Sequence, residues 1–349
     1  MEKPLASTPI GGLNVIFGTG PLGLATARAL LARGMRVRLV NRSGRRPPHD
    51  ALFQRDENAL VHQGLVEFAS CDATKAKEAI AAARGAAHVF HCANPRYDQW
   101  AEVLPPLQAA MIESALENAA TLIASEPLYM YLPSAGTIDE TTPIDPPTKK
   151  GRIRQAMHEL LKSAEAKRGL RWVTLRASDY YGPGAEGQSA FGTTRFLEPL
   201  ASGKAVSFLG NPDFMHSYTY LDDYGRSLAL GALTPASWGK AWIVPTAPAR
   251  STRELANMFA AELERLLGAS LPRGGLKRKF GAVPRSILRL AGLFDPVIRE
   301  VDEMLYQWRS DYVVDGAAFE RAFGLAPTSL ERGIVETVSS FSRSLDQRR

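Results

Sequence analysis

The feature that most constrains the fold is a trio of glycines near the N-terminus. An apolar stretch at residues 13–17 is followed at once by Gly18, Gly20 and Gly23 and by an Ala/Leu-rich stretch at 21–33. The first stretch is typical of a buried strand and the second of a helix. Between a strand and a helix, a Gly-x-Gly-x-x-Gly pattern is typical of the turn that holds a dinucleotide pyrophosphate in Rossmann folds. The pattern therefore predicts a dinucleotide site.

Each glycine has its own role in such a turn. Gly18 allows the tight turn, Gly20 lets the backbone approach the pyrophosphate, and Gly23 lets the helix pack closely on the sheet. The phosphates would lie at the helix N-terminus, where the helix dipole favours negative charge. The predicted cofactor contacts are Gly18, Thr19, Gly20, Pro21, Leu22 and Gly23. An ordinary glycine-rich turn is the alternative.

Strand and helix patterns alternate along most of the chain. Further strands are predicted at 36–40, 65–68, 88–93, 121–124, 172–176 and 241–244. Helices are predicted between them at 75–84, 107–119, 151–168 and 221–233. This alternation predicts an α/β fold with a Rossmann doubly wound parallel sheet.

Two segments break the alternation and predict a smaller C-terminal substrate-binding lid. The Rossmann domain is predicted to comprise residues 10–183, with 217–246 returning to it, and the lid to comprise 184–216 and 247–349. Lid helices are expected at 252–267, 286–293 and 297–307. The lid would cover the carboxyl ends of the strands, where open α/β sheets bind ligands. Its aromatic and Met side chains are expected to line the substrate site: Phe191, Phe196, Phe214, Met215, Tyr306 and Trp308.

The end of the second predicted strand bears on the choice of cofactor. NAD-binding folds usually place Asp or Glu there, whereas this chain has Asn41, Arg42 and Ser43. Arg42 can pair with a 2′-phosphate, Ser43 can donate to it, and Arg45 and Arg46 add positive charge. NADP(H) is therefore the predicted cofactor, with NAD(H) left open. A solvated basic loop is the other interpretation.

Composition narrows the class of protein. The chain has 349 residues, of which 45% are hydrophobic and 22% charged, as in an ordinary globular enzyme. The two cysteines, Cys71 and Cys92, form neither a disulfide framework nor a metal-binding pattern, so no metal is expected. No run of apolar residues approaches the roughly 18 needed for a membrane span. We therefore predict a cytoplasmic protein without a membrane partner.

The formal net charge of +6 does not by itself indicate nucleic acid. The densest basic stretch, 273–289, lacks the interleaved aromatics of a nucleic-acid surface and is interpreted as a solvated face. The predicted partner is a small-molecule substrate, with no nucleic acid, and a homodimer is left open.

Four further motifs occur in order along the chain. They are Cys71-Asp72-Ala73-Thr74, His91-Cys92-Ala93-Asn94, the segment 175–184 ending in Tyr-Gly-Pro-Gly, and the segment 217–223 ending in Asp-Asp. Together they resemble the extended and atypical short-chain dehydrogenase/reductases, the NAD-dependent epimerase/dehydratase-like superfamily, over nearly the whole chain. The resemblance implies that Asp72 and Ala73 lie at the adenine and that Cys92, Ala93 and Asn94 run beside the ribose and pyrophosphate. A cap or turn role is the alternative for Asp72.

The catalytic motif of that superfamily is missing. Its members carry Tyr-x-x-x-Lys on the helix after the fifth strand, and the matching positions here are Lys150 and Arg154; the usual Ser/Thr falls on Pro127. Reducing a carbonyl still needs a proton donor and a group that stabilises negative charge. We predict Tyr131, or failing it Tyr129, as the donor and Lys150 or Arg154 as the cationic helper. In an extended segment the two tyrosines would point the same way. Packing aromatics and a solvated helix face are the alternatives.

The predicted function is that of an NADP(H)-dependent oxidoreductase of the atypical short-chain dehydrogenase/reductase type. Its substrate would be a small carbonyl, alcohol or conjugated alkene. One alternative is a sugar-nucleotide epimerase or dehydratase, which depends on the missing Tyr-x-x-x-Lys pair. The other is a non-catalytic NADP(H)-binding sensor.

Overall fold

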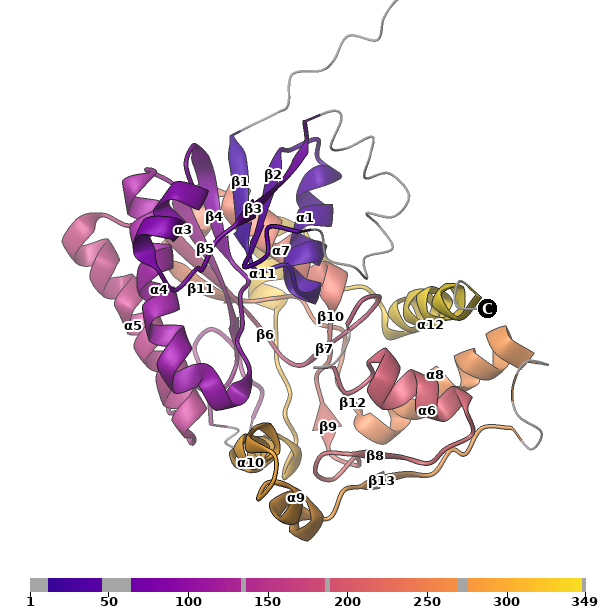
Figure 1. The fold of residues 1–349 in the computed structure, drawn as a ribbon. Helices are drawn as coiled ribbons and strands as arrows, with labels where there is room; N and C mark the ends of the chain where they lie inside the picture. The colour runs from indigo at the N-terminus through magenta and orange to yellow at the C-terminus, as the bar shows by residue number, and fades with distance from the viewer. Residues whose placement is uncertain are drawn as a thin grey trace, which may run out of the picture.

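The centre of the molecule is a seven-stranded sheet in which every pair of neighbouring strands is parallel (Figure 1). The computed structural model describes residues 12–45, 64–132, 136–185, 189–268, 271 and 275–346. The strand order is β3, β2, β1, β4, β5, β6 and β11, so the chain starts at the centre and winds outward to each side in turn. The predicted Rossmann doubly wound sheet is confirmed.

The strands and their covering helices lie close to the predicted positions. The strands are β1 (Leu13–Phe17), β2 (Val37–Asn41), β3 (Val66–Ser70), β4 (Ala86–His91), β5 (Thr121–Pro127), β6 (Trp172–Ala177) and β11 (Lys240–Ile243). The helices are α1 (Pro21–Leu31), α3 (Ala76–Ala82), α4 (Trp100–Glu117), α5 (Lys149–Arg168), α7 (Leu221–Leu233) and α11 (Ala317–Phe323). All residues of β1 and β6 are buried, as expected for strands covered on both faces.

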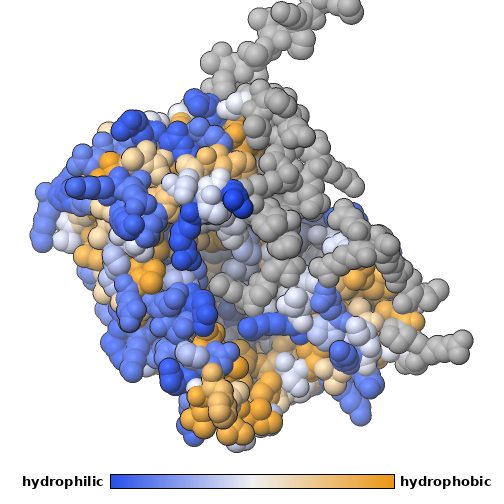
Figure 2. All heavy atoms as spheres, viewed as in Figure 1, coloured by the Kyte–Doolittle hydropathy of each residue, from blue (hydrophilic) through white to orange (hydrophobic). Residues whose placement is uncertain are grey.

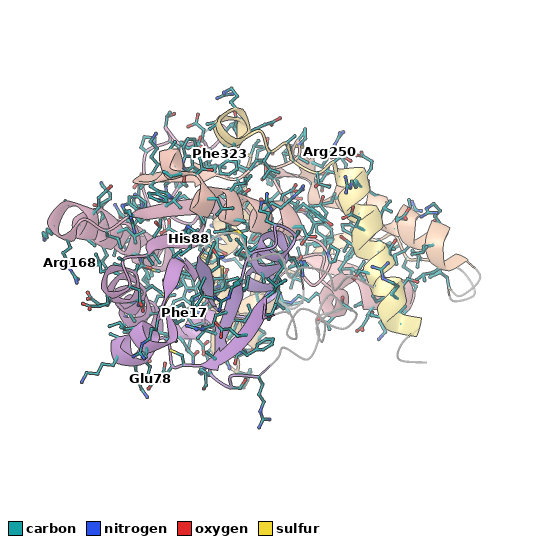
Figure 3. The ribbon with its side chains drawn as sticks, turned by 90° about the horizontal axis from the view of Figure 1, so that it is seen from above. Phe17, Glu78, His88, Arg168, Arg250 and Phe323 are labelled. Atoms are coloured by element: carbon teal, nitrogen blue, oxygen red, sulfur yellow. The ribbon has the colours of Figure 1, made fainter. Side chains whose placement is uncertain are left out.

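Helices cover both faces of the sheet. α3, α4 and α5 lie on one face, where Leu104 and Leu161 join the core. α1, α7 and α11 lie on the other, with Leu228 and Phe319. Figure 3 accordingly shows Glu78 of α3 and Phe323 of α11 on opposite sides of the sheet. α11 falls within the residues predicted for the lid, so this part of the C-terminal segment packs on the sheet instead.

Helix α4 begins earlier than its sequence predicts. The expected start at residue 107 follows two prolines, but the helix starts at Trp100 and contains Pro105 and Pro106. A proline inside a helix leaves the carbonyl four residues before it without a donor. Those carbonyls belong to Ala101 and Glu102, which are exposed, so water can hydrogen-bond to them.

A second, smaller core is built mostly from residues predicted for the lid, together with residues 180–181 and 219–220 of the predicted Rossmann domain. Its elements are β7 (Tyr180–Tyr181), a π-helix (Thr193–Leu197), α6 (Glu198–Ala201), β8 (Val206–Phe208), β9 (Met215–His216), β10 (Thr219–Tyr220), β12 (Arg250–Ser251), α8 (Thr252–Leu267), β13 (Phe280–Ala282) and α12 (Leu330–Asp346). Phe191 stacks on Phe259 and meets Phe196 edge to face, and all three are buried. Phe191 and Phe196 therefore form this core and do not line a substrate site as predicted.

Three short helices follow β13 and return to the sheet. They are α9 (Arg285–Ala291), α10 (Pro296–Val301) and the 3₁₀ helix η5 (Asp302–Trp308). α9 and α10 lie at the lower edge of Figure 1. α10 packs against η1 (Tyr97–Gln99), the turn that follows β4. No helix within the described ranges is both long and apolar enough to cross a membrane.

Candidate dinucleotide-binding and catalytic site

The turn between β1 and α1 has the backbone geometry that its glycines predict. Gly18 has φ +103°, and a Cβ there would lie 2.6 Å from the backbone nitrogen of Ala93. A Cβ on Gly23 would overlap the carbonyl oxygen of Gly18. Gly20, by contrast, has no heavy atom within 4 Å of the position its Cβ would take. The turn thus requires two of the glycines, while the third leaves space over the N-terminus of α1.

The predicted contacts at the end of β2 form a local turn. The amide nitrogen of Asn41 donates to Thr19 Oγ1 at 3.1 Å and to the carbonyl of Arg45 at 2.8 Å. The amide oxygen of Asn41 accepts from the backbone and hydroxyl of Ser43. Asn41 therefore shapes the turn, and Arg42 and Ser43 are exposed on it. Arg46 lies outside the described residues.

Residues that follow β3 and β4 were predicted to contact the cofactor, among them Asp72, Cys92, Ala93 and Asn94. Asp72 accepts hydrogen bonds from the backbone and hydroxyl of Thr74, which lower the pKa of its carboxyl. Burial raises the pKa of the Cys92 thiol to about 12, so that thiol stays protonated. Ala93 faces Gly18, and Asn94 accepts a hydrogen bond from Arg154. Asp72 thus holds a local turn, while Ala93 lies against the glycine turn and Asn94 against Arg154 of α5.

Lys150, which the sequence matches to the tyrosine of Tyr-x-x-x-Lys, is buried. Its Nζ donates to Glu300 Oε2 at 2.5 Å and to Glu303 Oε1 at 2.7 Å. The same nitrogen lies 5.3 Å from the ring centre of Tyr97. A solvated helix face is therefore excluded for Lys150, because α10 and η5 cover it with two carboxylates.

Arg154, one turn further along α5, is also buried. Its guanidinium lies 4.3 Å from the ring centre of Trp100 and donates to Asn94 Oδ1 at 2.9 Å. Burial lowers the pKa of this guanidinium. Arg154 therefore joins the start of α4 to the end of β4.

Tyr129 and Tyr131 point to different places, and the prediction that they share a direction is wrong. The segment turns after β5, with the N–H of Tyr131 donating to the carbonyl of Leu128 at 3.0 Å. Tyr129 stacks on Trp100, and its hydroxyl shares a short hydrogen bond with the hydroxyl of Tyr97. Burial raises the pKa of both phenols.

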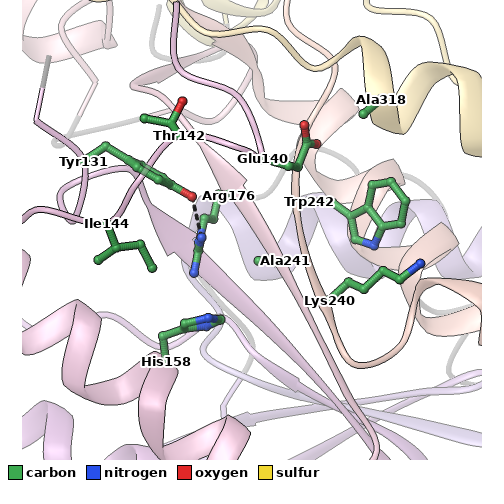
Figure 4. Close-up of a pocket in the computed structure, with 10 residues that line it drawn as sticks. All are labelled: Tyr131, Glu140, Thr142, Ile144, His158, Arg176, Lys240, Ala241, Trp242 and Ala318. Atoms are coloured by element: carbon green, nitrogen blue, oxygen red, sulfur yellow. Dashed lines mark hydrogen bonds between the residues drawn. The ribbon is translucent and has the colours of Figure 1, made fainter. Parts of the chain in front are cut away.

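Tyr131 instead faces a separate pocket of 420 Å³ beside β6 and β11 (Figure 4). Its hydroxyl accepts from Arg176 Nη1 at 2.5 Å, and Arg176 Nε donates to Glu126 Oε2 at 3.0 Å. Both members of this ion pair are buried. The other residues that line the pocket are Glu140, Thr142, Ile144, His158, Lys240, Ala241, Trp242 and Ala318. Of the two tyrosines, only Tyr129 contacts the group that surrounds Lys150 and Arg154.

Sequence reasoning missed several residues of this region. Glu300 and Glu303 are one helical turn apart, but no short motif links them to Lys150. His216 was missed as well: its Nε2 lies 3.0 Å from Asp179 Oδ2, and its ring stacks on Trp308, which was predicted to line the substrate site. These contacts bring the end of β6 to β9 and η5. The described residues contain no group of His, Cys, Asp or Glu that could hold a metal ion.

The sequence of the glycine turn and α5 lies inside a match to a known family. Residues 15–238 match the model of the NAD dependent epimerase/dehydratase family. The chain belongs to this family. No curated protein matches the chain in sequence.

Solved structures share the fold of this family member at low sequence identity. The dTDP-glucose 4,6-dehydratase of Streptomyces venezuelae, a double mutant with NAD bound, has a TM-score of 0.72 and 16% identity, covering 96% of this chain and 98% of that one. The UDP-glucuronic acid 4-epimerase of Bacillus cereus, in complex with NAD, has a TM-score of 0.71 and 16% identity, covering 95% and 99%. The UDP-glucose 4-epimerase of Thermotoga maritima, with UDP-glucose, has a TM-score of 0.72 and 16% identity, covering 95% and 99%.

Proposed function

We propose that this family member binds NADP(H) at the glycine turn and transfers hydride between it and a small carbonyl, alcohol or conjugated-alkene substrate. The observation that carries the proposal is the open N-terminus of α1. Gly20 is the N-cap of α1 and places no side chain over the helix end. Backbone N–H groups at a helix N-terminus bind phosphate, so these residues fit a dinucleotide.

The preference for NADP(H) rests on the exposed turn after β2. Arg42 and Ser43 are exposed on a turn that Asn41 shapes, and no carboxylate occurs at these three positions. A charge-assisted hydrogen bond from Arg42 to a 2′-phosphate contributes about 1.5–3 kcal/mol, or one to two decades in affinity.

The chain itself has to supply a proton and stabilise charge during the reduction of a carbonyl. A bound nicotinamide dinucleotide supplies the hydride. Tyr129 and Tyr97 stay protonated at neutral pH because burial raises the pKa of both phenols, so each carries a proton, and the Arg154 guanidinium counteracts this shift at Tyr97. One of the two hydroxyls donates to the other, and the accepting hydroxyl keeps its proton for a substrate oxygen. Arg154 is the cationic helper, because Lys150 is already paired with two carboxylates.

Calorimetry tests the cofactor assignment. NADPH should bind roughly 10–100-fold more tightly than NADH, and Arg42→Ala should remove that preference while leaving NADH affinity unchanged. Equal affinities in the wild-type protein would contradict the NADP(H) assignment.

A carbonyl, alcohol and alkene screen with NADPH or NADP tests the reaction. Tyr129→Phe should lower kcat by about 10²–10⁴-fold with NADPH affinity retained. Tyr131→Phe removes the same hydroxyl from the separate pocket and is the matched control, with kcat expected near that of the wild type. An equal loss in both variants would refute the role of Tyr129. Tight NADPH binding without turnover of any substrate would favour a sensor.

The second candidate function is sugar-nucleotide epimerisation or dehydration. The family description and the named solved structures favour it. Lys150 stands against it, because a paired lysine replaces the tyrosine on which that chemistry depends. Incubation with UDP-glucose, UDP-glucuronic acid and dTDP-glucose, followed by NMR, separates the two. An epimer or a 4-keto product would replace the oxidoreductase proposal.

A further inference from the structure

An exposed apolar patch lies on α9 and the turn that follows it. Ile287 and Leu290 are 55% and 61% exposed, and Leu293 and Phe294 are 74% and 85% exposed. They are the most exposed large hydrophobic side chains of the described residues. Figure 2 shows an apolar surface at the lower edge of the molecule, where α9 and α10 lie in Figure 1. We call these four residues the α9 patch.

Only a few residues of α9 and of the following turn face the protein, and most of the helix is exposed. Ile287 and Leu290 are three residues apart and so share one side of the helix. Gly292, in the turn, is buried against the backbone of Arg299 in α10, and Leu288 is half-buried. The turn after α9 thus packs against α10, while the apolar side chains of the α9 patch face solvent. Contiguous exposed patches of this kind mark interaction sites.

The chain segment that leads up to and includes the α9 patch carries charges of one sign, and Asp295 and Asp302 follow it. Residues 265–294 contain seven Lys and Arg and no Asp or Glu. The described ones outside α8 are all exposed: Lys277, Arg278, Lys279, Arg285 and Arg289. Arg278 pairs with Glu264, and Arg285 and Arg289 reach Asp302. Lys277 and Lys279 extend the positive surface toward β13, next to α9.

We propose that the α9 patch docks on an anionic membrane surface. Apolar side chains that protrude from a short amphipathic element, with Lys and Arg beside them, are the combination that binds the interface of a bilayer. Anionic headgroups attract the neighbouring basic residues, whereas a zwitterionic surface offers no such attraction. The sequence predicts no membrane partner, because no apolar run is long enough to span a membrane, and its basic stretch 273–289 is interpreted as a solvated face. The structure places apolar side chains beside that basic stretch.

The docking surface adjoins the covered site. α9 leads through the turn at Leu293 and Phe294 into α10, and Glu300 of α10 pairs with Lys150. A membrane at the α9 patch would therefore lie next to the element that covers the start of α5.

Vesicle flotation of the full chain tests the proposal. The protein should float with vesicles of phosphatidylcholine and phosphatidylserine, float much less with phosphatidylcholine alone, and be released by salt. The double variant Leu293→Glu/Phe294→Glu should reduce binding at least about tenfold. Lys277→Glu/Lys279→Glu should remove most of the preference for phosphatidylserine.

A matched control is Leu160→Glu, which puts the same charge on a leucine of α5 that is 43% exposed and outside the patch. This variant should float like the wild type, and thermal melts should show all variants folded. Absence of flotation by the wild type, or equal loss in the control, would overturn the proposal. So would a dimer in sedimentation that the double variant dissociates while no vesicle binding occurs, because the patch would then be covered by a second copy.

Discussion

The turn before α1 and the start of α5 lie at the same edge of the sheet but are built differently. The first is made by backbone, through the positive φ of Gly18 and the open face at Gly20. The second is made by charged side chains: Lys150 is paired with residues that follow it by 150 positions or more, and Arg154 is held by Trp100 and Asn94. A backbone turn is encoded in a few neighbouring residues, whereas a side-chain cluster depends on the whole fold.

The largest expected effect concerns another site built from charged side chains, the buried pair between Glu126 and Arg176 beside the Tyr131 pocket. Glu126→Gln leaves a buried guanidinium without its counter-charge, so the free energy of unfolding in urea should fall by about 3–5 kcal/mol. Glu113→Gln, in the partly exposed pair with Arg168, is the control and should cost at most about 1 kcal/mol. Equal losses of unfolding free energy in the two variants would show that the buried pair at the ends of β5 and β6 stabilises the fold no more than a surface ion pair does.

The backbone-built region is tested by two alanine substitutions. Gly23→Ala forces a Cβ onto the carbonyl of Gly18, so the free energy of unfolding should fall by about 1–3 kcal/mol and NADPH binding should weaken with it. Gly20→Ala meets open space and should change stability by less than about 0.5 kcal/mol. Calorimetry should nevertheless show weaker NADPH binding for Gly20→Ala, because the methyl group would occupy the proposed phosphate position. Unchanged NADPH affinity in Gly20→Ala would show that the phosphates do not bind at this turn.

The sequence predicted α8 and the glycine turn well, because the motifs that specify them consist of neighbouring residues. The bounds of α8 are confirmed as predicted, and its start is fixed by a capping box between Ser251 and Glu254. The glycine turn is likewise a run of neighbouring residues. The prediction that Tyr131 points the same way as Tyr129 is wrong, because the chain turns after β5. No pattern near Lys150 could identify Glu303 as its partner.

The α9 patch shows a further limit of sequence patterns. A helix was predicted at 286–293 from its apolar spacing and was assigned to the lid. The spacing is correct for a helix, since α9 spans Arg285–Ala291. Periodicity reports that one side is apolar, but it does not report whether that side meets the protein or the solvent.

His91, at the end of β4 between the two regions, predicts a pH dependence. Burial and nearby Arg154 lower its pKa to about 4, so it stays neutral in the folded protein while the unfolded chain binds a proton below pH 6.5. Stability is therefore fully present above pH 6.5 and is lost progressively as the pH falls toward 4. Between pH 6.5 and 5 this amounts to about 2 kcal/mol. Urea unfolding of His91→Gln should show a shallower pH slope than the wild type; an unchanged slope would contradict the assignment.

The smallest expected effect on stability concerns the N-terminal caps of α1 and α5. Thr148 caps α5 by accepting from the N–H of Gly151 at 3.0 Å, whereas the cap of α1, Gly20, has no side chain to offer. Thr148→Ala should lower the free energy of unfolding by about 1 kcal/mol, equally with and without NADPH. A loss that NADPH reverses would mean that the start of α5 also responds to the cofactor.

The pairing of Lys150 with Glu300 and Glu303 has a consequence for synthesis on the ribosome. At translation rates of about 5–20 residues per second, roughly 8–30 s separate the emergence of Lys150 from that of its carboxylates. During that interval the ammonium group has water and no counter-charge, so the start of α5 stays hydrated although most of the sheet has been made. The arrival of α10 and η5 then dehydrates and neutralises it in one step. The last helices to be translated near this site therefore complete its interior, and a nascent chain halted before Glu300 should expose Lys150 to amine-reactive reagents.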